Sequence, residues 1–382
     1  MLTPLHFVPR PASSGSAHAA DAEAVVGAYA FSATLAIQDI TQLATSGVTA
    51  SHIAKRLEGS AESEALLFGL SSRTALRPVG PLGYQELMEE DLLDIEAWVF
   101  ISLPLLEDTR VIEANVTLDA AIAPLPGEEV PAAPWHGAFT LIDDLSARLN
   151  RPIRQLWVTH TPGTWEPPGA TEHGYAAAFR EDQAVFRAEA VAVGAGMEIS
   201  VVEGPGFAGA ITASATYPGG EEARERDTAQ FSALLTAASR DYPRGELALE
   251  TIEWDLRRIT DAGARLMDRG GQQLTGIARV GGRDRTEDPG AIVGLCEAVH
   301  YSSDDDAVCE LGLIYVLPVY RGKGVGTTLV AKTVARAREV WEDLETVYVS
   351  YPAGSPAAES ITTRFEAEVV SSTTAWQKES FI

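Results

Sequence analysis

The stretch VLPVYRGKGVGTTLVAKTV, residues 316–334, decides the fold of this chain. It places three glycines at alternate positions behind an arginine and runs directly into a segment whose apolar residues have helical spacing. Because glycine has no Cβ, the N–H groups of residues 321–326 can point into one concavity, and the start of the helix adds a positive dipole end. Arg321 and Lys323 add full positive charges. This loop therefore predicts an anion site, for which a pyrophosphate is the natural occupant.

Two familiar phosphate-binding motifs do not fit this loop. A Walker loop requires Ser or Thr after Gly-Lys, whereas Lys323 is followed by Gly324. A dinucleotide-binding fingerprint requires G-x-G-x-x-G on the first strand of a doubly wound domain, whereas these glycines are spaced G-x-G-x-G. After Gly326 the 56 residues 327–382 leave room for about one further βαβ unit. A nucleotide-binding half-domain is therefore excluded.

The loop resembles the coenzyme A site of the GCN5-related N-acetyltransferase (GNAT) superfamily. That site carries R/Q-x-x-G-x-G/A between the fourth strand and the next helix, and Arg321, Gly324 and Gly326 occupy its three positions. The resemblance implies an α/β (α+β) fold, with a mixed, mostly antiparallel sheet that is splayed between strands four and five and flanked by helices. It also implies acetyl-CoA as acyl donor, held in the splay, and no metal.

The resemblance further implies which residues hold the cofactor. The backbone of residues 316–318 would pair with the pantetheine arm, and the N–H groups of residues 321–327 would hold the pyrophosphate. The expected cofactor-binding residues are Val316, Leu317, Pro318, Arg321, Gly322, Lys323, Gly324, Val325, Gly326 and Thr327.

The order of predicted elements occurs twice along the chain, whose 382 residues and 46% hydrophobic content suffice for two cores. Predicted helices are followed by strands, a loop, a helix and further strands in each half. We therefore expect two tandem GNAT-like domains, residues 1–193 and 194–382, similar to actinobacterial tandem-repeat members of the superfamily. In the first half, DAAIAPLPGEEVPAAPWHG (119–137) replaces the glycine loop and carries Glu128 and Glu129. Such a loop would repel a pyrophosphate, which predicts a degenerate N-terminal copy without a cofactor site.

The boundaries of the predicted elements follow from apolar spacing. Two or three helices are expected between residues 24 and 67, and a further helix and strand are expected to end near Val193. Strands are expected at 65–72, 95–104, 110–120, 153–161, 197–204, 272–280, 291–301, 309–316, 345–353 and 368–379, helices at 140–150, 220–240, 248–268, 326–344 and 357–365, and a hairpin turn at 302–307.

Attack on a thioester requires a neutral amine and therefore a general base. Glu310 is the first candidate, because in the histone-acetyltransferase branch of the superfamily the catalytic glutamate has the same spacing from the arginine of the loop. Glu297, on the preceding strand, is the second candidate, and a solvent-facing strand residue is the alternative interpretation of either. Many family members protonate the leaving thiolate from a tyrosine at the position where this chain has Phe365. Tyr351 is the candidate substitute acid.

The charge balance limits the partners. Lys and Arg number 29 against 54 Asp and Glu, which gives a formal net charge of -25. Nucleic acids and anionic membranes are therefore not expected to bind, whereas a cationic small molecule would be attracted. No signal peptide or continuous apolar span is evident, and the two cysteines, Cys296 and Cys309, are expected as buried free thiols, so the predicted location is cytoplasmic. A monomer or a homodimer is expected.

These observations together predict an acetyl-CoA-dependent N-acetyltransferase acting on the primary amine of a small, cationic molecule. Glu310 and Tyr351 are the predicted catalytic residues, and the C-terminal copy is the predicted active one. Two alternatives stay open. One is a coenzyme A-binding sensor or scaffold that lost proton transfer, which Phe365 favours, and the other is a structural pseudo-acetyltransferase that binds no cofactor.

Overall fold

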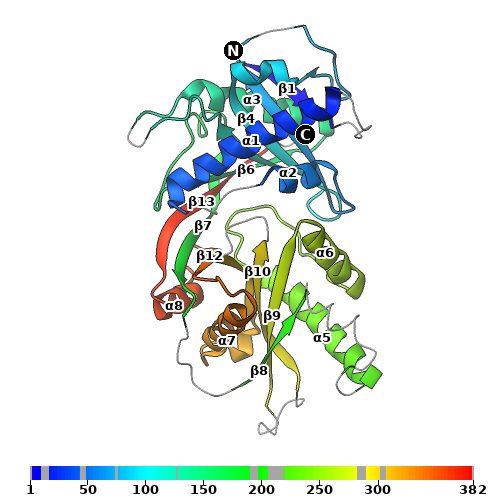
Figure 1. Ribbon diagram of the computed structural model, residues 1–382, viewed down its shortest axis with the longest axis vertical. Coiled ribbons are helices and arrows are strands. Elements are labelled where there is room, and N and C mark those ends of the chain that lie inside the picture. The colour runs from blue at the N-terminus through cyan, green and yellow to red at the C-terminus, as the bar shows by residue number, and fades with distance from the viewer. Residues whose placement is uncertain are drawn as a thin grey trace. The chain divides into compact units, whose positions relative to one another are not determined.

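The chain forms two compact units that interleave along the sequence (Figure 1). Unit 1 contains Met1–Glu181, Arg244–Glu250 and Val370–Ile382, and unit 2 contains Asp182–Pro243 and Thr251–Val369. The computed structural model describes residues 2–9, 17–43, 49–73, 76–125, 128–189, 197–204, 217, 220–281, 290–301 and 307–380.

Unit 1 is a mixed sheet with helices on both faces. Its strand order is β3-β1-β2-β4-β5-β6-β13-β7. The strands are β1 (Thr3–Phe7), β2 (Ser63–Ser71), β3 (Gln85–Glu86), β4 (Ile95–Pro104), β5 (Val111–Leu118), β6 (Ile153–His160) and parts of β7 (Ala176–Arg187) and β13 (Glu368–Glu379). The helices are α1 (Ala17–Thr41), α2 (Ala50–Leu57), the 3-10 helix η1 (Glu89–Asp94) and α3 (Ala132–Leu149).

Successive side chains of β4 point to opposite faces of the sheet and contribute to two separate apolar clusters of unit 1. Trp98 and Phe100 pack with Tyr29 of α1 on one face. Val99 and Ile101, which point to the opposite face, pack with the residues of α3. The central strand is thus apolar on both faces, as a sheet covered by helices requires.

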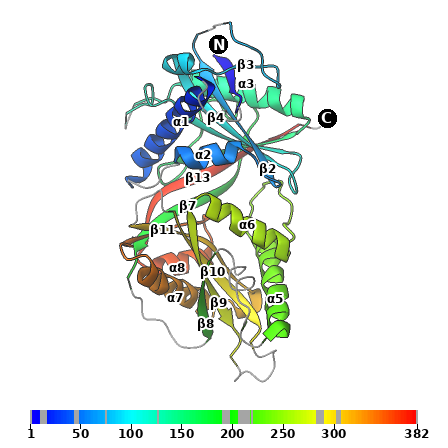
Figure 2. The ribbon, with the colours of Figure 1, turned by 45° about the vertical axis from the view of Figure 1, so that its right-hand side comes forward.

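Unit 2 has the same layered arrangement, seen from a second direction in Figure 2. Its strand order is β7-β12-β11-β10-β9-β8. The strands are β8 (Glu198–Glu203), β9 (Gly271–Arg279), β10 (Ile292–Tyr301), β11 (Val308–Val316), β12 (Thr346–Pro352) and residues 182–187 of β7. The helices are α5 (Gly220–Asp241), α6 (Leu256–Asp268), the 3-10 helix η2 (Pro318–Tyr320), α7 (Val325–Val340) and α8 (Pro356–Arg364).

Two apolar clusters sandwich the sheet of unit 2. On one face, Phe231 of α5 and Ile259 of α6 pack against Leu295 of β10. On the other face, Leu329 of α7 belongs to a cluster that also contains Leu311 of β11. Each unit therefore has a pair of helices on one face of the sheet and the helix that follows the fourth main strand on the other. The expected α/β fold with two GNAT-like copies is confirmed.

Most predicted elements occur within a few residues of their expected bounds, and the exceptions are informative. Strands β1 and β3 were not predicted, and two helices precede β2, as the expected two or three allow. The helix expected before the strand that ends near residue 193 is wrong, because residues 161–175, between β6 and β7, are turns and loop. Helix α3 begins at Ala132 instead of 140, because Pro134 lies in its first turn, where proline removes no helical hydrogen bond. Helix α6 begins at Leu256 instead of 248, with Asp255 as its N-cap. The predicted turn at 302–307 and the domain boundary at 193/194 fall largely or wholly outside the described residues.

One helix among the described residues is long and apolar enough, by length and composition, to cross a membrane. It is the part of α1 from Ala22 to Thr41. Its Val25, Val26 and Tyr29 are buried in the core of unit 1 against the sheet. This burial is the pattern of a core helix.

Segment 244–250 belongs to unit 1 although its neighbours in the chain belong to unit 2. Gln377 of β13 holds it there. The Gln377 Oε1 accepts the N–H of Ala248 at 3.0 Å and the Nε2 of Gln155 at 3.0 Å, and its Nε2 donates to the carbonyl of Glu246 at 3.1 Å. One side chain of the last strand thus joins a strand and a distant loop segment of the same unit.

We predict that Gln377→Ala loosens this segment. The substitution leaves the N–H of Ala248 and the carbonyl of Glu246 without their partner, which costs about 1–2 kcal/mol of unfolding free energy. Urea unfolding measures the loss, and amide hydrogen exchange at Ala248 should become faster. Gln377→Glu keeps the acceptor and loses the donor, so its effect should be intermediate. Unchanged exchange at Ala248 in Gln377→Ala would contradict this account.

Candidate functional site

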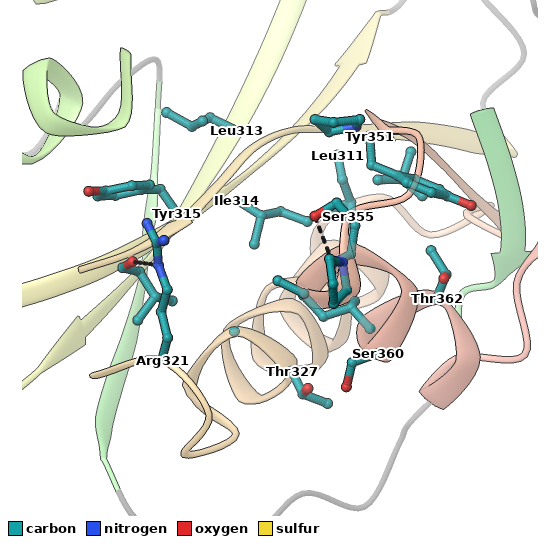
Figure 3. Close-up of a pocket in the computed structure, with 18 of the residues that line it drawn as sticks. Leu311, Leu313, Ile314, Tyr315, Arg321, Thr327, Tyr351, Ser355, Ser360 and Thr362 are labelled. Atoms are coloured by element: carbon teal, nitrogen blue, oxygen red, sulfur yellow. Dashed lines mark hydrogen bonds between the residues drawn. The ribbon is translucent and has the colours of Figure 1, made fainter. Parts of the chain in front are cut away.

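The site of unit 2 lies where two parallel strands separate. Strand β11 pairs with β12 from Val308–Thr346 to Leu311–Val349. Beyond these pairs, residues 312–316 of β11 and 350–352 of β12 line a cavity of about 540 Å³ (Figure 3). This volume lies in the usual range of small-molecule sites. The cavity therefore occupies the splay that the resemblance implied between strands four and five.

A β-bulge lies at the point of separation. Strand β10 pairs with β11 as Ala298–Leu311 and Cys296–Ile314, so Gly312 and Leu313 together oppose the single residue Glu297. A bulge bends the strand that carries it and increases its twist. Because the pairing with β12 ends at Leu311, the bend begins at the residue where β11 leaves its parallel neighbour.

The glycine loop forms one end of the cavity. Gly322 and Gly324 have φ of 72° and 75°, in the left-handed region that favours glycine, and Gly324 is the N-cap of α7. At a helix N-terminus the first N–H groups have no partner within the helix. Those of Val325 and Gly326 belong to residues that line the cavity. This end of the cavity is built to bind an anion.

Seven of the ten expected cofactor residues line the cavity. These are Val316, Arg321, Gly322, Gly324, Val325, Gly326 and Thr327. The other three, Leu317, Pro318 and Lys323, are not part of the lining. The N–H of Leu317 donates to the carbonyl of Val293 at 2.9 Å, and Lys323 lies over the ring of Tyr320, with its Nζ 5.2 Å from the centroid.

Arg321 is held by three groups. Its Nε donates to the carbonyl of Val316 at 2.8 Å, its guanidinium lies 5.4 Å from the centroid of the Tyr315 ring, and its Nη2 is 3.7 Å from Asp241 Oδ2. The same Asp241 oxygen accepts the hydroxyl of Tyr315 at 2.6 Å, which lowers the pKa of the Asp241 carboxyl. The arginine is therefore preoriented at the cavity, but one carboxylate already balances part of its charge.

The two candidate bases lie on the same face of the sheet. Glu310 is directly opposite Val299, and Val299 is two residues from Glu297 on β10, so all three side chains point to the face that α5 and α6 cover. Glu310 is exposed and is not part of the cavity lining. Burial raises the pKa of Glu297 to about 7, against the opposing effect of hydrogen bonds from the Gln273 side chain and the Leu313 N–H. Glu310 lies two residues before the cavity-lining Gly312 on β11, and Glu297 lies opposite Gly312 on β10.

The candidate acid, Tyr351, does line the cavity, and Figure 3 shows its ring beside Leu311 and Thr362. Burial and, to a smaller extent, the negative charge of Asp182 raise the pKa of its hydroxyl. Phe365, at the position expected for the family tyrosine, is buried and packs on Phe186 with ring centroids 4.9 Å apart. It is not part of the lining.

Several lining residues were not predicted from the sequence. Asp241 comes from the end of α5, and Ser355, Ser360 and Thr362 come from α8 or its N-cap. The pattern Ser-Pro at 355–356 indicates a helix start, but nothing local shows that this helix faces the loop of α7. Among the described residues, no group of three or more His, Cys, Asp or Glu could hold a metal ion.

In the corresponding loop of unit 1, side-chain carboxylates accept hydrogen bonds from two of the backbone N–H groups. Between β5 and α3, the Glu128 carboxylate accepts the N–H of Leu125 at 2.9 Å, and that of Asp119 accepts the N–H of Ala121 at 3.0 Å. Carboxylates here occupy N–H groups that a phosphate would otherwise use. No described residue of this loop has a positive φ. The anion-binding features of unit 2 are absent from the described part of this segment.

Comparisons with known proteins agree with this geometry. Residues 234–358 match the model of the acetyltransferase (GNAT) family, which confirms the expected acetyltransferase type at the level of the family. No curated protein sequence matches the chain significantly. A solved tandem GNAT protein from the clavulanic acid biosynthesis pathway superposes with a TM-score of 0.60 at 13% identity, covering 99% of this chain and 98% of that one. A GCN5-related N-acetyltransferase from Sphaerobacter thermophilus gives a TM-score of 0.54 at 14% identity, covering 98% and 95%.

At these identities the structural similarity establishes the fold, while the family match covers the segment from α5 to α8 that builds the cavity. The splayed strands, the glycine loop and the match fall in the same part of the chain. Residues 234–358 thus carry a domain of the acetyltransferase (GNAT) family, and the chain as a whole has the fold of the solved tandem GNAT protein.

Proposed function

We propose that the protein transfers an acetyl group from acetyl-CoA to the primary amine of a small molecule, and that unit 2 carries the reaction. The observation that carries this proposal is the position of the glycine loop in the wall of the cavity between β11 and β12. Such a cavity can hold a long, thin ligand with its anionic end at α7. Residues 312–316 of β11 and 350–352 of β12 would then hold the acyl end of the ligand.

The glycine loop would hold the pyrophosphate of coenzyme A. Its left-handed glycines let the backbone approach the anion closely, and the N-terminus of α7 adds its dipole. Arg321 adds a full charge, preoriented on Tyr315. The cofactor supplies the activated thioester, and the protein orients it and handles protons.

Two protons must move during the transfer. The acceptor must lose one to become a neutral nucleophile, and we propose Glu310 or Glu297 as the base that removes it. The departing thiolate must gain one, and we propose Tyr351 as its donor. A raised pKa keeps the Tyr351 hydroxyl protonated at neutral pH, and its ring lines the cavity beside the splay.

A cationic acceptor is favoured by charge. The net charge of -25 attracts amines that are protonated in solution, and Asp241 adds a carboxylate to the cavity lining. The two cysteines are free and buried, which agrees with a reducing compartment such as the cytoplasm. We retain a monomer or a homodimer as the proposed state.

A second candidate function is a coenzyme A-binding sensor that does not turn over. Phe365 favours it, because this side chain packs against Phe186 and offers no proton. The enzyme and the sensor differ in whether bound acetyl-CoA releases free thiol when an amine is added.

We predict that acetyl-CoA stabilises the wild type against heat and does not stabilise Gly324→Glu. At 100 times its dissociation constant, a ligand specific for the folded state contributes about 2.7 kcal/mol, or a few degrees of melting temperature. The glutamate would place a carboxylate at the pyrophosphate site, where a Cβ on Gly324 meets nothing within 4 Å. Thermal melts with and without acetyl-CoA measure the difference.

Gly290→Glu is the matched control for this prediction. Gly290 also has a positive φ, 90°, with nothing within 4 Å of its added Cβ, and it does not line the cavity. It carries the same backbone strain and the same charge. We expect acetyl-CoA to stabilise Gly290→Glu and not Gly324→Glu. Equal stabilisation of both variants would show that the glycine loop does not hold the cofactor.

We predict that Tyr351→Phe lowers kcat for thiol release by about a hundredfold, since a general acid typically contributes that much or more. Acetyl-CoA should still stabilise the variant, because the ring that lines the cavity is kept. Tyr348→Phe, on the same strand but outside the cavity lining, is the control. Thiol release is followed across a panel of amines. A wild-type kcat in Tyr351→Phe would show that the thiolate leaves without this acid.

A further inference from the structure

The bulge on β11 leaves a position without a side chain in the cavity wall, beside the partly buried carboxylate of Glu297. Gly312, one of the two bulged residues, lines the cavity and lies opposite Glu297. A Cβ on Gly312 would lie 3.8 Å from both the Cβ and the Oε2 of Glu297. Because glycine has no side chain, this position beside the carboxylate is empty in a residue that lines the cavity.

The Glu297 carboxylate is held in this position by the protein. It accepts hydrogen bonds from the side chain of Gln273 and from the N–H of Leu313, the second bulged residue. Gln273 in turn donates to the hydroxyl of Thr275 at 3.3 Å, and Thr275 is the direct cross-strand neighbour of Glu297 on β9. The bulge therefore supplies both the gap and one of the bonds that orient the carboxylate.

The environment of Glu297 suits proton acceptance near neutral pH. Burial raises the pKa of this carboxyl to about 7, while the two hydrogen bonds oppose the rise. An effective base has a pKa close to the working pH. On the same face of the sheet, β11 also carries the titratable Glu310 and Tyr315, and Asp241 of α5 accepts the Tyr315 hydroxyl, whereas Ile259 of α6 is apolar. Gln273 and Thr275 of β9 do not titrate.

Resting on the proposed acetyltransferase function, we infer that Glu297 is the general base for the acceptor amine and acts through the gap at Gly312. The acceptor enters as an ammonium ion, and Glu297 takes one proton from it through a water molecule in the gap. The neutral nitrogen attacks the thioester carbon, so that an N–C bond forms and the C–S bond breaks. The second nitrogen proton passes to the sulfur, directly or through Tyr351, and Glu297 returns its proton to solvent.

Glu310 is less well placed for this step. It shares the sheet face of Glu297, but it lies on the far side of Leu311 from the separation of the strands, where β11 is still paired with β12. Neither glutamate is itself part of the cavity lining, but the Glu310 side chain is exposed, whereas Glu297 is partly buried opposite the lining residue Gly312. Proton transfer requires hydrogen-bond reach to the substrate, directly or through one water, and the gap at Gly312 gives that reach to Glu297.

The first test is Glu297→Gln, which keeps the shape of the side chain and an oxygen that can accept the Leu313 N–H. We expect kcat for thiol release to fall by about a hundredfold or more at pH 7, with the stabilisation by acetyl-CoA unchanged. In the wild type, kcat/KM should rise with pH through about 7, because the base works only when it is deprotonated. This rise should be absent in the variant.

A readout independent of activity is the infrared absorption of the carboxyl group. The difference spectrum between wild type and Glu297→Gln should contain a protonated carboxyl band that disappears as the pH rises through about 7. Glu198→Gln, an exposed glutamate on the edge strand β8, is the charge-matched control and should show neither the spectral change nor the loss of kcat.

The second test closes the gap and keeps the base. In Gly312→Ala the added methyl group meets nothing closer than 3.8 Å, so the variant should fold with an unchanged melting temperature. We expect a loss of kcat of tenfold or more, while the infrared titration of Glu297 persists. Wild-type kcat in this variant would overturn the role of the gap.

The remaining outcomes separate this inference from the function on which it rests. Wild-type kcat and pH dependence in Glu297→Gln, or a larger loss in Glu310→Gln than in Glu297→Gln, would overturn the assignment of the base while leaving the acetyltransferase intact. A wild type that is stabilised by acetyl-CoA but releases no thiol with any amine would overturn the proposed function and the base together.

Discussion

The site of unit 2 depends on the bulge at Gly312 and Leu313. The pairing of β11 with β12 ends at Leu311, the residue directly before the bulge. The extra residue bends the strand away from its parallel neighbour at that point. The cavity and the empty position beside Glu297 lie at this irregularity.

Unit 1 shows what the same arrangement of elements does without the bulge. Strands β4 and β5 pair without a shift from Ala97–Leu118 to Ser102–Glu113, and β5 then pairs with β6 over five residues. The loop that follows uses Glu128 for its own N–H groups. In unit 1, the lack of a glycine loop therefore occurs together with a pairing of β4 and β5 that contains no bulge. This agrees with the proposal that the N-terminal copy is degenerate, and it shows that the difference lies in the backbone as well as in the loop residues.

The sequence was sufficient where the signal is local. The glycine spacing of residues 321–326 identifies the loop, because left-handed conformations at Gly322 and Gly324 are decided by those residues themselves. Periodicity identifies α5 and α7 for the same reason. The interleaving of the units could not be predicted, since segment 244–250 is bonded to residues of unit 1 that are far away in sequence, namely Asp108, Ala178 and Gln377. Contacts of this kind leave no pattern in the neighbouring residues.

The choice between the two glutamates has the same origin. The resemblance favours Glu310 through its spacing from Arg321, with Glu297 as the second candidate. The proposed preference for Glu297 comes from the bulge, which places Gly312 and Leu313 opposite it. The sequence could therefore name both glutamates, but the spacing carries no sign of the bulge that distinguishes them.

Burial raises the pKa of both proposed proton carriers, the base Glu297 and the acid Tyr351. It raises the pKa of the Glu297 carboxyl to about 7, so this group is an acceptor only above neutral pH. It also raises the pKa of the Tyr351 hydroxyl, which therefore stays protonated and can only donate. The same physical effect acts on groups whose ordinary pKa values lie on either side of neutrality. Burial thus brings the pKa of the proposed base close to neutral pH and, together with the charge of Asp182, keeps the proposed acid protonated.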